Sequence, residues 1–217
     1  MELKLHLTVH EARSGRESFR VIRPARTPEH AELFDDAWWL SAYVDRDAAL
    51  LMAGLWTLAA GSPRSLVHLP LRGPTPPAGS GRLDLVLLHH SLRVAPSHWK
   101  GLRGRLSPGR PRTVDLRLTE PPEEDHASLH HAENRDRFHQ SLHAETLFMT
   151  GSARTFRQGA AVFLDVARNG PGHTVAYPDR PYRHRHYCRN VVCGARFRDI
   201  HVESREPPAP GEDPARA

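Results

Sequence analysis

Two histidines and a serine lie at the end of the clearest strand pattern in the chain. The run Leu85–Leu88 is unbroken, which predicts a strand covered on both faces, and His89, His90 and Ser91 come after it. Ligands of open α/β sheets bind at the carboxyl ends of strands. An imidazole there can act as a general base near neutral pH and activate a serine hydroxyl. We therefore treat these three residues as catalytic candidates; the alternative is that one histidine packs or caps and the other is solvated.

A second candidate site is the segment FMTGSARTFR, which contains Gly151, Ser152, Arg154 and Arg157. The sequence predicts a strand at 145–150 and a helix that begins at Ser152. The free N–H groups and the positive dipole end of such a helix attract phosphate, sulfate or carboxylate, and the arginines would add charge. The alternative is that Ser152 only caps the helix while the arginines face water. The segment is not a P-loop, because Gly-x-x-x-x-Gly-Lys is missing.

These two groups form one site if the strands at 82–90 and 145–150 run parallel, since their carboxyl ends then lie at the same edge of the sheet. Ser152 and Arg154 would hold an anion, and His89 or His90 would lie within reach as an acid or base. The leading hypothesis is a small intracellular enzyme or binding protein for an anionic ligand, including a phosphorylated one. The absence of a Gly-x-Ser-x-Gly motif leaves the reaction undefined.

A weaker pattern near the end of the chain is compatible with zinc. On a strand, His184 and His186 share one face, and Cys188 or Cys193 would complete a tetrahedral site. No Cys-x-x-Cys pair is present, and arginines alternate with the histidines. The alternative is a solvated strand of arginine and histidine.

The chain is basic, with 30 Lys and Arg, 25 Asp and Glu, a net charge of +5 and a pI of about 9.7. The stretches 92–112 and 180–198 each hold six basic residues and no acid. A nucleic-acid-binding or accessory protein is therefore an alternative function. Its candidate contacts are Arg93, Lys100, Arg103, Arg105, Arg183 and Arg185. Compositional bias toward arginine explains the charge equally well. A protein–protein interaction module without catalysis is a further alternative.

Length and composition predict the setting of these sites. A chain of 217 residues with 39% hydrophobic content can bury the core of one main domain, which we expect at 1–203 with a Pro/Gly loop at 73–82. The tail at 204–217 has no large apolar residue and is expected to be disordered. We expect no membrane partner, because the longest nearly uncharged stretch is too short to cross a bilayer. Two cysteines, with no apolar leader, predict a cytoplasmic protein.

The predicted elements alternate, which indicates an α/β (or α+β) fold with a central mixed sheet flanked by helices. Strands are expected at 3–9, 18–22, 65–71, 82–90, 113–118, 145–150 and 173–177, with a hairpin or irregular pair at 182–192 and 196–203. Helices are expected after Asp45 or Asp47 up to Gly61, around Trp99, at 126–143 and at 152–168. A further helix is expected to start at Thr27-Pro28-Glu29 and to carry Phe34, Trp38 and Trp39 into the core. The elements from 82 to 118 resemble a βαβ unit.

Overall fold

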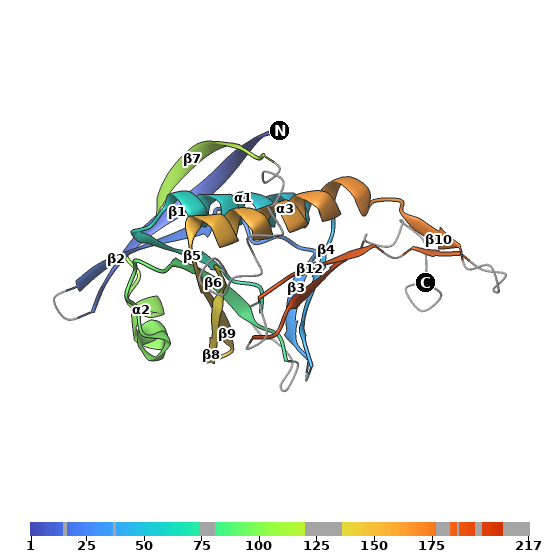
Figure 1. The fold of residues 1–217 in the computed structure, drawn as a ribbon. Coiled ribbons are helices and arrows are strands. Elements are labelled where there is room, and N and C mark those ends of the chain that lie inside the picture. Colours follow the sequence, from blue (N-terminus) through green and yellow to red (C-terminus); the bar gives the residue numbers. More distant parts are fainter. Residues whose placement is uncertain are drawn as a thin grey trace.

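The computed structural model of this chain describes residues 1–14, 17–36, 38–73, 81–119, 136–176, 183–185, 187–193 and 197–205. These residues form a mixed α/β fold with two mixed sheets, a short two-stranded ribbon and three α-helices (Figure 1). The predicted fold class is therefore confirmed. No helix in the described part of the chain combines the length and the apolar character needed to cross a lipid bilayer.

The larger sheet has seven strands in the order β7-β1-β2-β5-β6-β9-β8. Their bounds are β1 Glu2–Ser14, β2 Glu17–Pro24, β5 Ser65–Leu69, β6 Asp84–His89, β7 Arg110–Arg117, β8 His139–His143 and β9 Thr146–Gly151. The pairs β2–β5 and β6–β9 are parallel and the other neighbours are antiparallel. As its unbroken apolar run predicts, β6 is an inner strand and is buried over nearly its whole length.

The smaller sheet has the order β12-β13-β4-β3. Its strands are β3 Ala31–Asp35, β4 Leu40–Val44, β12 Cys188–Val191 and β13 Ile200–Ser204, and a separate ribbon pairs β10 Thr174–Ala176 with β11 Arg183–Arg185. The helix predicted from Thr27 is therefore wrong. Ala31 and Leu33 are buried while Glu32 and Phe34 are not, which is the two-residue period of a strand.

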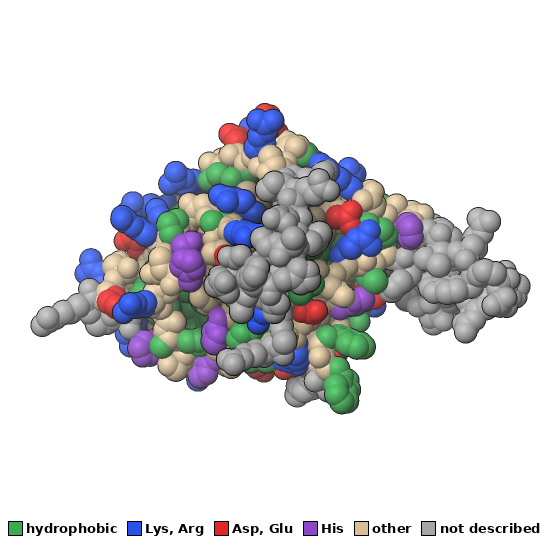
Figure 2. All heavy atoms as spheres, in the orientation of Figure 1, with side chains coloured by type: hydrophobic (Ala, Val, Ile, Leu, Met, Phe, Trp, Pro, Cys, Tyr) green, Lys and Arg blue, Asp and Glu red, His purple; other side chains and the backbone are tan. Residues whose placement is uncertain are grey.

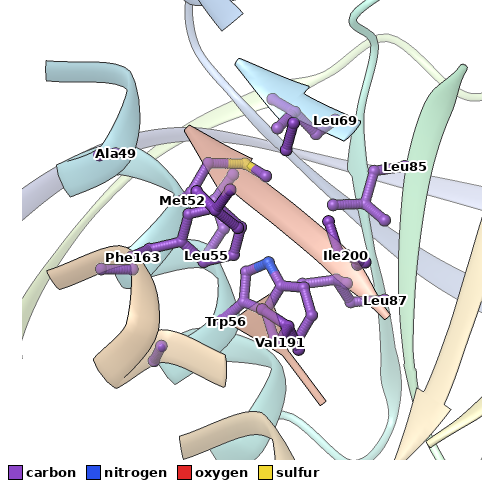
Figure 3. Close-up of a cluster of buried hydrophobic side chains, with 14 of the residues drawn as sticks. Ala49, Met52, Leu55, Trp56, Leu69, Leu85, Leu87, Phe163, Val191 and Ile200 are labelled. Carbon is purple, nitrogen blue, oxygen red and sulfur yellow. The ribbon is translucent and has the colours of Figure 1, made fainter. Parts of the chain in front are cut away.

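Two long helices lie side by side over both sheets (Figure 1). Helix α1 (Arg46–Gly61) begins after Asp45, which accepts a hydrogen bond from the Ala48 N–H, and α3 (Ala153–Asn169) begins after Ser152. Both helices were predicted from these caps and from their apolar stripes. Figure 3 shows Trp56 of α1 and Phe163 of α3 packed together with strand residues of both sheets, among them Leu87 and Ile200. One hydrophobic core thus joins the helix pair to the two sheets.

The other face of the larger sheet is covered by a 3-10 turn, Pro96–His98, and by α2 (Trp99–Arg103). Trp99 and Leu102 pack there against Val21, Leu66 and Val86 in a second apolar cluster. The strand after α2 does not return beside β6. Because β7 pairs with β1 at the sheet edge, the predicted βαβ unit is wrong.

Two further expectations concern segments that are described only in part. Of the helix predicted at 126–143, residues 126–135 lie outside the described part of the chain. Residues 139–143 form strand β8 instead of a helix. The predicted tail at 204–217 lies outside the described residues from 206 onward. Ser204 itself still belongs to β13, so the ordered sheet extends one residue past the predicted boundary.

Candidate functional site

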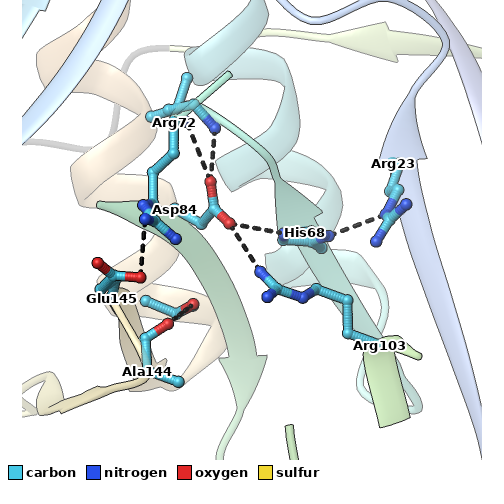
Figure 4. A network of polar contacts seen from close by, with 9 residues as sticks. Arg23, His68, Arg72, Asp84, Arg103, Ala144 and Glu145 are labelled. Atoms are coloured by element: carbon cyan, nitrogen blue, oxygen red, sulfur yellow. Dashed lines mark hydrogen bonds and ion pairs between the residues drawn. The ribbon is translucent and has the colours of Figure 1, made fainter. Parts of the chain in front are cut away.

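A row of polar side chains crosses three neighbouring strands on the face covered by α2. Arg23 comes from β2, His68 from β5 and Asp84 from β6, and Arg103 reaches the row from α2 (Figure 4). Ile22 of β2 pairs with Val67 of β5, so the residues that follow them point to the other face together. We call these four residues, Arg23, His68, Asp84 and Arg103, the polar row.

Asp84 is the acceptor at the centre of the polar row and is almost fully buried. Its Oδ1 accepts hydrogen bonds from the backbone N–H groups of Leu71 (2.9 Å) and Arg72 (3.1 Å), and its Oδ2 from Nη1 of Arg103 (3.1 Å). Burial opposes ionisation, but the His68 ring and the two backbone N–H groups outweigh it and hold the pKa of Asp84 below its usual value. Asp84 is therefore a buried carboxylate.

His68 is neutral and its tautomer follows from its neighbours. Nε of Arg23 donates to Nδ1 of His68 at 2.8 Å, and an arginine Nε is always a donor, so the ring proton is on Nε2. Nε2 lies 3.9 Å from Oδ2 of Asp84, too far for a hydrogen bond, and is buried with no partner. The Trp99 ring packs edge-on at 4.8 Å between centroids. Burial, together with the charges of Arg23 and Arg103, lowers the pKa of His68.

Positive charge is in excess around the polar row. Arg72 forms an ion pair with Glu145 (2.7 Å), which lies in the β8–β9 turn where Ala144 and Glu145 have φ of 47° and 55°. Three guanidinium groups therefore face two carboxylates, from Asp84 and Glu145, and leave one positive charge unbalanced. Burial, and then the charge of Arg103, lowers the pKa of Arg23. Among the described residues, the terminal nitrogens of Arg23 have no acceptor.

We expect the polar row to make the protein less stable in mild acid. The pKa of His68 is lowered from about 6.5, so below that pH the unfolded chain binds a proton that the folded protein does not. The contribution of neutral His68 to the free energy of unfolding is fully present above this pH. It is lost as the pH drops toward the pKa of His68 in the folded protein, by at most about 1.4 kcal/mol per pH unit. The free energy of unfolding, measured with urea at several values between about pH 7.5 and 5, should fall less steeply with decreasing pH in His68→Gln than in wild type. The exposed His30→Gln variant is the matched control, and equal slopes for all three proteins would contradict the expectation.

The histidines predicted as catalytic lie at the same sheet edge as the start of α3. Strands β6 and β9 are parallel with His89 opposite Gly151, and the His90 N–H donates to the Gly151 carbonyl at 2.9 Å. The condition for a shared sheet edge, that these two strands run parallel, is therefore met. Nδ1 of His89 lies 2.8 Å from Oγ of Ser91, and the two histidine rings are 4.4 Å apart. A catalytic role for His89, His90 and Ser91 stays a prediction.

Ser152 is fully used as a helix cap. Its Oγ accepts from the N–H groups of Arg154 (3.1 Å) and Thr155 (3.2 Å) and donates to the carboxylate of Asp136. The positive end of α3 therefore already faces an internal carboxylate. The side chains of Arg154 and Arg157 are exposed and have no hydrogen bond or ion pair within the described part of the chain. The anion site predicted here stays a prediction, and its arginines match the alternative in which they face water.

The zinc pattern lies partly outside the described residues. His186 and the side chain of His184 are not described, and no group of three potential metal ligands occurs among the residues that are. Cys193 is buried, and its Sγ accepts from Nε2 of Gln140 at 3.1 Å. Burial, with the charge of Asp199, raises the pKa of Cys193 to about 12, so this sulfur is a thiol at neutral pH. Cys188 is also a free thiol.

The predicted nucleic-acid contacts divide into three groups. Arg93, Lys100 and Arg105 are exposed. Nη1 of Arg103 donates a hydrogen bond to Asp84. The side chains of Arg183 and Arg185 are not described. Figure 2 shows Lys and Arg side chains spread over the visible face with acids between them. This distribution does not single out one basic stripe on that face.

The sequence analysis did not identify the polar row. Its signal was a charged or titratable residue inside an apolar strand, as in SLVHLPL and RLDLVLLHH, because buried polar groups need partners. Arg103 was noted only as a nucleic-acid contact. A comparison with known protein families, curated proteins and solved structures finds no match to this chain.

Proposed function

We propose that this protein binds a small anionic ligand through a phosphate or carboxylate group held between Arg23 and Arg103. The main observation in support of this proposal is the unbalanced positive charge of the polar row. Two guanidinium groups lie near a single carboxylate, and that carboxylate already accepts two backbone hydrogen bonds. An anion would relieve the repulsion between the two arginines and accept from their unused N–H groups.

The surroundings of the polar row support this proposal. Asp84 and His68 are buried, and their contacts fix the positions of the arginine side chains before a ligand arrives. Lys100 lies one helical turn from Arg103 on α2 and adds positive charge. The side chain of Arg103 is about one-third exposed, so a ligand can approach it from solvent.

The start of α3 is a poorer anion site than the polar row. An anion there would have to displace the carboxylate of Asp136, which already satisfies Ser152. The proposal therefore keeps the predicted ligand class but assigns it to other residues. The same phosphate chemistry could come from a small molecule or from a nucleic acid, and the test must separate these sources.

We expect inorganic phosphate to bind to the wild-type protein in isothermal titration calorimetry and to raise its melting temperature. Arg23→Ala and Arg103→Ala should each weaken phosphate binding by about tenfold to a hundredfold, because a hydrogen bond to a charged group contributes about 1.5–3 kcal/mol. Arg154→Ala, at the start of α3, is the matched control and should bind phosphate like wild type. If an alanine variant unfolds, the corresponding lysine variant keeps the charge and should show an intermediate affinity.

Adenosine monophosphate and a short single-stranded DNA form the other arms of the experiment. Tighter binding of the nucleotide than of the DNA would support a small-molecule ligand. Binding of DNA alone, with affinity falling steeply with salt, would favour the nucleic-acid function instead. Absence of phosphate binding at millimolar concentration, or its loss in Arg154→Ala but not in Arg23→Ala, would overturn the proposal.

A further inference from the structure

The turn between β3 and β4 carries two tryptophans that the described chain leaves uncovered. Trp38 is 84% exposed and Trp39 is 54% exposed, whereas Trp56 and Trp99 are fully buried. Val192, in the connection between β12 and β13, is 71% exposed. Figure 2 shows hydrophobic side chains protruding at the lower end of the β3–β4 region. Large apolar side chains exposed together mark an interaction site.

These side chains line an open groove of about 720 Å³, which we call the tryptophan groove. Its apolar lining comes from Trp38 and Trp39 of the β3–β4 turn and from Val192 and Phe197 of the β12–β13 connection, and Asn190 and His201 add polar groups. Tryptophan is the residue type most enriched among the side chains that dominate binding energy at protein interfaces. The groove is therefore suited to receive an apolar side chain of another molecule.

The residues behind the groove hold its two sides together. Nη1 of Arg198 donates to the carboxylate of Asp35 and to the carbonyl of Asp36 (2.9 Å), which ties the β12–β13 connection to the β3–β4 turn. Nε2 of Gln140 in β8 donates to the Arg198 carbonyl at 2.8 Å. Ser41 donates to the Asp36 carboxylate and fixes the turn. These contacts reduce the conformational entropy that Arg198, Asp35 and Asp36 lose on binding.

The charge beside the groove is opposite to that of the whole chain. Asp35, Asp36 and Asp199 face one cation, Arg198, which leaves a local charge of −2 in a chain whose net charge is +5. Asp36 and Asp199 have no ion pair within the described residues. A polyanion such as nucleic acid would be repelled here, and a basic segment would be attracted.

We propose that the tryptophan groove is the docking site for a protein partner that presents an apolar side chain flanked by lysine or arginine. The apolar side chain would pack between Trp38, Trp39 and Val192, and the flanking cations would lie near Asp36 and Asp199. This site is separate from the polar row, so its test does not depend on the anionic ligand.

A random peptide library displayed on phage, selected on the purified chain, tests the proposal. We expect selected peptides to be enriched in Lys and Arg beside a large apolar residue, and their synthetic forms to bind with an affinity that falls with salt. The Trp38→Ala and Trp39→Ala variants should each weaken binding at least about 30-fold, as for interface hot spots. Leu142→Ala removes another exposed apolar side chain, on β8, and should bind like wild type.

Intrinsic fluorescence gives an independent readout, because two of the four tryptophans are exposed and two are buried. Bound peptide should shift the emission to shorter wavelength and protect it from acrylamide quenching. Asp36→Asn with Asp199→Asn keeps both side-chain acceptors and should remove the preference for basic peptides. No enrichment over a Trp38→Ala/Trp39→Ala selection, or enrichment of acidic or uncharged peptides, would overturn the proposal. Self-association in analytical ultracentrifugation that is lost in Trp38→Ala would also overturn it, since the occupant would then be a second copy.

Discussion

Replacing Asp84 by alanine is expected to lower the free energy of unfolding by about 3–5 kcal/mol, because it removes a buried carboxylate and leaves three donors without their acceptor. The variant leaves the N–H groups of Leu71 and Arg72 without their acceptor and leaves Arg103 without its counter-charge. Each unsatisfied buried donor costs about 1–3 kcal/mol. Urea unfolding at neutral pH, followed by circular dichroism, measures the difference.

Two variants define the cause of this loss. Asp84→Asn keeps an acceptor for the two backbone N–H groups but removes the charge, so it should fall between wild type and Asp84→Ala. Asp115→Ala removes an exposed carboxylate that lies 4.0 Å from Nζ of Lys4, and should change stability by less than about 0.5 kcal/mol. A loss below about 1 kcal/mol in Asp84→Ala would mean that Asp84 does not organise the polar row.

The elements that the sequence predicted correctly are those with local signals. The caps Asp45 and Ser152 predict helices α1 and α3, together with apolar residues at helical spacing. All of these signals lie within a few residues of one another. Strand β6 follows from one unbroken apolar run. The failure at 27–39 has the same origin, because Thr27-Pro28-Glu29 is a good helix start whose signal outweighed the two-residue alternation of Ala31 to Phe34.

The candidate site depends on pairings that no local signal contains. Arg23 and His68 are 45 residues apart and meet only because β2 and β5 are parallel neighbours. Which strands pair is decided by the packing of the whole sheet, so β7 next to β1 was also missed. The β6–β9 edge could be predicted conditionally, since both strands were visible and only their direction was unknown. Trp38 and Trp39 were predicted to lie in the core, because tryptophan is usually buried there, but both are exposed.

Helix α3 packs tightly against Trp56 of α1 at Gly159, where a Cβ atom would overlap with Cε3 and Cζ3 of the Trp56 ring. The indole of Trp56 is fully buried and packs edge-on against Phe138 and Phe156. Helix α3 can therefore reach this position only because Gly159 has no side chain. The effect of Gly159→Ala on the free energy of unfolding should therefore change sign when Trp56 is removed.

We expect Trp56→Ala to lower the free energy of unfolding by about 3–5 kcal/mol, and Gly159→Ala alone to lower it by about 1–3 kcal/mol through overpacking. In the Trp56→Ala background the overlap is gone, and Gly159→Ala should instead stabilise by about 0.5–1 kcal/mol, because alanine is a better helix former than glycine. Gly61→Ala, whose Cβ meets no atom within 4 Å, should have the same effect in both backgrounds. A double-mutant cycle from urea unfolding measures the coupling. If Gly159→Ala destabilised both backgrounds equally, the close packing of α3 on Trp56 would not be what requires glycine at this position.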